Sequence, residues 1–112
     1  MNIYLERSFE TMDTEETVSS RLYKWSQEGG FICTRASLGY WEYRRGTRFQ
    51  ALYTFKMQKI PTTVTVRMKD EQPANVHCSM VVKSWLSIET GRDKKRFNEQ
   101  MKLLVAYIEG SL

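Results

Sequence analysis

The sequence predicts an α+β domain in the order β-α-β(4-5)-α, an antiparallel sheet with both helices packed on one of its faces. Two segments carry apolar residues at helical spacing and end at glycine, whereas apolar and polar residues alternate in the remaining segments, as in half-buried strands. A chain of 112 residues, of which 41% are hydrophobic, is long enough to bury a core. We therefore expect a single domain over residues 1–112.

The chain opens with a strand and an amphipathic helix. The strand, expected at an edge of the sheet, is predicted from the alternating apolar residues Ile3, Leu5 and Phe9. Asp13 and Glu16 have the spacing of a capping box, which predicts a helix with Asp13 as its N-cap. Its apolar side and its end are marked by Val18, Leu22 and Trp25, then by Gly29 and Gly30.

The pattern of apolar and polar residues in the middle of the chain predicts the remaining strands of the sheet. Strands are expected over residues 31–38, 40–45, 49–57, 62–69 and 76–88, with Gly39 between the first two and a tight turn at Arg45 and Gly46. A second capping box at Thr90 and Asp93 then begins a helix, which ends at Gly110. Its apolar stripe consists of Phe97, Met101, Leu104, Val105 and Ile108.

In this order of elements the chain resembles one half of a TATA-box-binding protein, kinase-associated domains and helix-grip lipid-binding domains. The resemblance rests on element order, so it implies a fold and no particular function.

The cysteines indicate the cellular compartment of the protein, and the distribution of charge indicates the kind of partner it could bind. Cys33 and Cys78 lie in strand-like runs and are expected to be buried free thiols, and the sequence predicts a cytoplasmic protein. The net charge is +4, but residues 1–30 carry −3 and residues 31–112 carry +7. An acidic first helix is thus joined to a basic sheet and last helix.

The sequence offers little for catalysis, and we expect a non-enzyme without cofactor or metal. His77 is the single histidine, and no spacing typical of a zinc site surrounds it. His77 and Cys78 point to opposite faces of a strand, so they cannot act as a pair. The carboxylates gather at helix starts and turns, where capping and the helix dipole explain them.

The sheet face opposite the helices is the first candidate for binding. Its predicted members are the basic residues Arg48, Lys56, Arg67, Lys69 and Lys83 and the apolar residues Tyr4, Val81 and Trp85. Arginine and lysine among aromatic side chains suit nucleic acid and also suit a protein interface. The alternative is an ordinary solvated sheet, whose threonines and charges reflect β propensity and solubility.

The start of the last helix is the second candidate, with the basic residues Arg92, Lys94, Lys95 and Arg96. Cations are disfavoured at the positive end of a helix dipole, so a phosphate, a lipid head group or an acidic partner segment is expected to compensate them. The alternative is a solvated cluster that Asp93 and Glu99 partly neutralise.

Residues 40–45 are the third candidate. Trp41 and Tyr43 share one strand face and are expected to pack under a helix, while Tyr40, Glu42 and Arg44 face water. At a sheet edge, the same segment would instead offer an aromatic and arginine hot spot to a partner.

From these observations we expect a non-catalytic protein-interaction domain: an adaptor, a chaperone-like protein or an assembly factor. Its partner is another protein or a second copy of the chain. One alternative is a binder of nucleic acid or acidic membrane, whose affinity falls with salt. Another is a helix-grip carrier with an apolar ligand among Phe55, Met57, Met80 and Met101.

Overall fold

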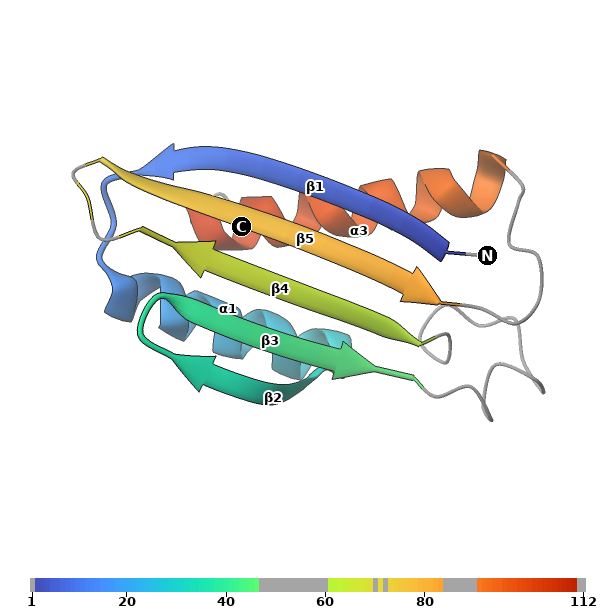
Figure 1. Cartoon of the computed structure of the whole chain (residues 1–112), viewed down its shortest axis with the longest axis horizontal. Coiled ribbons are helices and arrows are strands. Elements are labelled where there is room, and N and C mark those ends of the chain that lie inside the picture. The colour runs from blue at the N-terminus through green and yellow to red at the C-terminus, as the bar shows by residue number, and fades with distance from the viewer. Residues whose placement is uncertain (1, 47–60, 70, 72, 84–90, 111–112) are drawn as a thin grey trace.

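The computed structural model describes residues 2–46, 61–69, 71, 73–83 and 91–110, with the backbone alone for residues 2, 83 and 91–94. The elements follow the order β1 (Asn2–Thr11), α1 (Glu15–Gly29), β2 (Ile32–Ser37), β3 (Tyr40–Arg45), β4 (Thr62–Met68), β5 (Ala74–Lys83) and α3 (Gly91–Glu109). The strands form one antiparallel sheet in the order β1-β5-β4-β3-β2. Figure 1 shows both helices behind the same face, α3 behind β1 and β5 and α1 behind β3 and β4. The predicted fold class is confirmed, and β1 is an edge strand as expected.

Three sequence predictions lie outside the described residues. They are the strand over residues 49–57, the part of the last strand beyond Lys83, and the capping box that begins at Thr90. Neither helix in the described part of the chain is long and apolar enough to cross a membrane.

The start of α1 differs from the prediction by one residue. Thr14 is the N-cap, because its extended backbone lets the Thr14 hydroxyl accept a hydrogen bond from the Thr17 amide at 3.2 Å. Asp13 is instead held by Arg21, whose Nη1 lies 2.6 Å from Asp13 Oδ2 and 2.8 Å from the carbonyl oxygen of Ile108. Arg21 therefore joins the end of β1, the helix α1 and the last turn of α3.

The core lies between the sheet and the two helices. Every second residue of β4 and β5 points into it, including Val64, Val66, Val76, Met80 and Val82. The helices contribute their predicted apolar sides through Val18, Leu22, Trp25, Phe97, Met101, Leu104 and Ile108. Trp25 stacks on Phe31 with ring centroids 4.5 Å apart and meets Tyr43 edge-on at 5.5 Å. Trp41 and Tyr43 are thus core residues, as expected.

The two cysteines differ in exposure, which corrects one prediction. Cys78 is buried in the centre of the sheet as expected, but Cys33 is exposed. Cys33 belongs to the edge strand β2, in which all six residues are exposed and the register with β3 shifts between Cys33 and Arg35. An apolar neighbourhood in sequence does not bury a residue of an edge strand, because a strand is present on one side alone.

Thiol labelling tests this difference. Burial raises the pKa of the Cys78 thiol to about 12, so at pH 8 it is both inaccessible and protonated. With Ellman's reagent we expect the folded chain to release one equivalent of thiolate quickly and a second only after unfolding in urea. Cys33→Ser removes the fast equivalent. Two fast equivalents in the folded chain would contradict the burial of Cys78.

Candidate functional site

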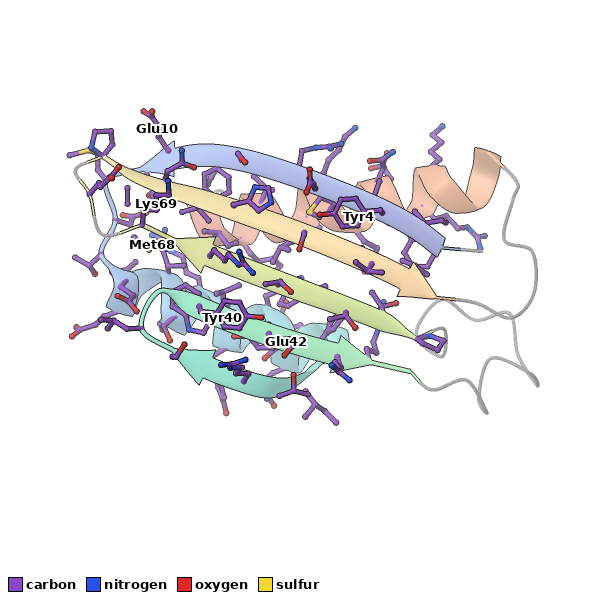
Figure 2. All side chains as sticks on the ribbon, viewed as in Figure 1. Tyr4, Glu10, Tyr40, Glu42, Met68 and Lys69 are labelled. Atoms are coloured by element: carbon purple, nitrogen blue, oxygen red, sulfur yellow. The ribbon has the colours of Figure 1, made fainter. Side chains whose placement is uncertain are left out.

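The face of the sheet that points away from the helices is open, since both described helices lie on the other side (Figure 1). Strand pairing places its side chains in three rows across the sheet. From β1 to β2 these rows are Tyr4, Val81, Thr63, Arg44 and Ile32; Glu6, Ser79, Thr65, Glu42 and Arg35; and Ser8, His77, Arg67, Tyr40 and Ser37. Figure 2 shows Tyr4, Tyr40 and Glu42 on this face.

The half of the open face over β2, β3 and β4 carries an arginine–tyrosine cluster, which consists of Arg35, Tyr40, Glu42, Arg44 and Arg67. The guanidinium carbons of Arg35 and Arg67 each lie 5.5 Å from the centre of the Tyr40 ring. Arg44 Nη2 lies 3.4 Å from Glu42 Oε1. With three arginines and one glutamate, the cluster has an excess of positive charge and an aromatic ring between two cations.

The half over β1 and β5 is a hydrogen-bonded network without such an excess. Ser8 Oγ lies 2.7 Å from His77 Nδ1, and His77 Nε2 lies 3.6 Å from Glu6 Oε1. The Tyr4 hydroxyl donates to the same Glu6 oxygen, which raises the pKa of Tyr4. Serine, histidine and carboxylate are the groups of nucleophilic catalysis, and here they lie exposed on the open face of β1 and β5. Water competes for these contacts, because the side chains of His77 and Glu6 are 42% and 49% exposed.

The predicted open-face residues fall into two groups. Tyr4, Arg44, Arg67 and Val81 are placed on this face by strand pairing. Lys69 is exposed directly after β4. Arg48, Lys56 and Trp85 lie outside the described residues, and the side chain of Lys83 is not described. Arg35 was not among the predicted residues, because the irregular pairing next to it shifts the inside-outside alternation of β2.

The predicted basic helix start lies on the other side of the sheet. Lys95 and Arg96 are exposed on α3, and Arg92 and Lys94 belong to the same helix with the backbone alone described. This end of α3 meets β1, where Arg7 Nη2 donates to Asn98 Oδ1 at 3.0 Å. The first and second candidate surfaces that the sequence predicted for binding therefore face opposite directions.

The space between α3 and the sheet, which the carrier hypothesis assigned to a ligand, is occupied by side chains in the described part. Met80 and Met101 are fully buried there, while Phe55 and Met57 lie outside the described residues.

A groove of about 670 Å³ lies elsewhere, between the first turns of α1 and the turn from β2 to β3, with Leu38 and Trp41 on one side and Glu16 on the other. The described residues contain no group of three His, Cys, Asp or Glu side chains able to hold a metal.

A curled antiparallel sheet with a long C-terminal helix on one face is the helix-grip arrangement, and solved structures share it. The chain is similar to the crystal structure of Ara h 8.0201, with a TM-score of 0.61, 7% sequence identity and coverage of 99% of this chain and 97% of that chain. It is also similar to the di-domain ARO/CYC BexL, with a TM-score of 0.50, 8% identity and coverage of 97% of this chain and 49% of the other. The chain thus spans about half of that di-domain protein. At such identities the likeness shows the fold alone.

No family model matches the chain. No curated protein matches its sequence.

Proposed function

We propose that this chain is a non-catalytic protein-binding domain that captures an acidic protein surface on its open sheet face. The observation that carries the proposal is the arginine–tyrosine cluster, in which Tyr40 lies between Arg35 and Arg67 on a face that no described element covers. Arginine and tyrosine are among the residues that are more frequent in protein interfaces than on the rest of a protein surface.

The geometry of the cluster supports a role in binding because its side chains contact one another in the unbound chain. Each exposed contact between an arginine and the Tyr40 ring contributes about 0.5–1 kcal/mol. Two such contacts restrict the motion of the Tyr40 ring, which lowers the entropy lost when a partner docks. The guanidinium groups of Arg35 and Arg67 also keep donors for carboxylates of the partner.

The charge pattern selects the kind of partner. The cluster has an excess of positive charge over β2, β3 and β4, whereas the network of Tyr4, Glu6 and His77 over β1 and β5 does not. A partner with carboxylates around an apolar centre would match the first half and leave the second half at the rim. A uniformly charged polymer such as nucleic acid would gain from the first half alone.

Affinity capture from cells that express the chain tests this proposal, with two baits of equal charge change. Arg67→Glu reverses a charge in the cluster, and Arg96→Glu reverses an exposed charge on α3, on the other side of the sheet. We expect Arg67→Glu to reduce capture of the partner at physiological salt by about tenfold or more, since a fully desolvated charge pair is worth over 1.4 kcal/mol. Arg96→Glu is expected to capture as the unmodified chain does.

Three outcomes would overturn the proposal. An equal loss of capture with both baits would indicate that long-range electrostatic attraction alone holds the partner. A loss of capture with Arg96→Glu alone would place the binding site on α3. Loss of all capture after nuclease treatment would replace the protein partner by nucleic acid.

A further inference from the structure

Arg45 is a buried arginine on the helix side of the sheet. It is the last residue of β3, and its side chain is 8% exposed. Its Nη1 donates a hydrogen bond to the carbonyl oxygen of Gly29 at 2.8 Å, and its guanidinium carbon lies 4.1 Å from the centre of the Phe31 ring. Its Nε is buried and donates no hydrogen bond to any residue that the structure describes.

The charge of Arg45 has no counter-charge in the part of the chain that the structure describes. The ion pairs found there use the carboxylates of Glu6, Asp13, Glu42 and Glu99, and none of these pairs includes Arg45. Burial removes the guanidinium from water and lowers the pKa of Arg45. Buried charges in proteins are normally paired, because an unpaired one costs several kcal/mol.

The described contacts of Arg45 provide a hydrogen-bond acceptor on only one edge of its guanidinium, the Nη1 edge. Arg45 covers the C-terminus of α1, whose last turn holds no basic residue, and so compensates the negative end of the helix dipole. The Phe31 ring adds a cation–π contact. Neither contact uses Nε, and neither supplies an anion.

We infer that Arg45 anchors an anion-binding site at the end of β3, which takes the carboxylate or phosphate group of a ligand. A planar guanidinium binds such groups through two parallel N–H donors. The Gly29 carbonyl repels an anion from the Nη1 edge, so the ligand would take Nε and Nη2 as its parallel donors and displace the side chains that cover Nε. The site goes beyond the proposed function, because Arg45 lies on the opposite face of the sheet from the arginine–tyrosine cluster.

Nuclear magnetic resonance of the arginine Nε–H groups in the whole chain tests this inference directly. Sodium phosphate and sodium acetate are the two probes, and sodium chloride at matched ionic strength is the control. We expect one Nε–H signal to move saturably with a probe and not with chloride, and we expect that signal to be missing in Arg45→Lys. In Arg44→Lys, which alters the neighbouring residue on the open face, the signal should remain and respond as before.

The two probes distinguish the sources of the anion. A response to phosphate alone indicates a phosphorylated ligand, and a response to acetate alone indicates a carboxylic acid. A shift that follows ionic strength equally in chloride, or a responding signal that persists in Arg45→Lys, would overturn the inference.

Thermal unfolding of a second variant provides an independent measurement. Arg45→Met keeps most of the side-chain volume and removes an unpaired buried charge, so we expect it to fold. At a probe concentration of ten times Kd, binding to the folded state alone shifts the unfolding equilibrium of the unmodified chain by about elevenfold. We expect no such shift in Arg45→Met, and an equal shift in both proteins would refute the site.

Discussion

Gly39→Ala is expected to lower the free energy of unfolding by about 2–4 kcal/mol, the sum of left-handed strain and a steric clash. Gly39 lies in the turn between β2 and β3 with φ +69°, a conformation that residues with a side chain rarely adopt. A Cβ at this position would stand 2.5 Å from the carbonyl oxygen of Met68, which belongs to β4 and cannot swing away like a side chain. The hydrogen bond from the Met68 amide to the Gly39 carbonyl, 2.9 Å long, would be strained as well.

Gly30→Ala is the matched control for this change. Gly30 follows α1 with φ +72°, close to that of Gly39, but a Cβ there would meet no atom within 4 Å. We expect this variant to lose about 1 kcal/mol, the strain of the left-handed conformation alone. Urea unfolding of both variants measures the difference. Equal losses would show that the close approach of Gly39 to β4 does not exist in solution.

The close approach at Gly39 also connects the fold to the candidate site. The Gly39 amide donates to Glu15 Oε1 at 2.5 Å, so one turn is bonded both to the start of α1 and to the end of β4. Tyr40 follows directly, and Arg35 lies on the paired strand. We therefore expect Gly39→Ala to loosen the arginine–tyrosine cluster in addition to destabilising the fold.

The fold could be predicted because each strand and each helix buries one of its faces. Burial of one face gives a periodic pattern of apolar residues that is visible in the sequence. The predictions that were wrong concern the end of a helix and an edge strand of the sheet. Asp13 and Thr14 both suit an N-cap. The choice between them depends on Arg21, which lies about two turns into α1 and also bonds the end of α3. Cys33 is exposed because β2 has one neighbouring strand and an irregular register, neither of which the sequence reveals.

The candidate site was predicted in part. Alternation placed Tyr40, Arg44 and Arg67 on the face away from the helices, and the structure agrees. Arg35 and Arg67 are far apart in the chain, and both contact the Tyr40 ring. Their approach depends on the order of the strands in the sheet, which the sequence does not show. The sequence also placed Arg45 at the end of a strand, as the structure does, but the pattern did not indicate that Arg45 is buried.

Alkaline pH is expected to remove several kcal/mol of stability between pH 9 and 12. Burial raises the pKa of Cys78 from 9.0 to about 12 and, with a smaller effect of Cys33, the pKa of Tyr43 from 10.0 to about 12. Both groups are neutral when protonated, and their pKa values are higher in the folded state. Their contribution is therefore complete below pH 9 and is lost as the pH approaches 12, by up to about 1.4 kcal/mol per pH unit for each group.

Tyr43→Phe isolates one of the two groups. It removes the ionisable hydroxyl and keeps the ring that packs edge-on against Trp25. We expect its free energy of unfolding, measured in urea with a reductant present, to fall less steeply above pH 10 than that of the unmodified chain. Tyr23→Phe, at a residue that is 67% exposed, should leave the steepness unchanged. If Tyr43→Phe and the unmodified chain lost stability in parallel, the phenol of Tyr43 would have to ionise within the folded core, and its burial against Trp25 would be refuted.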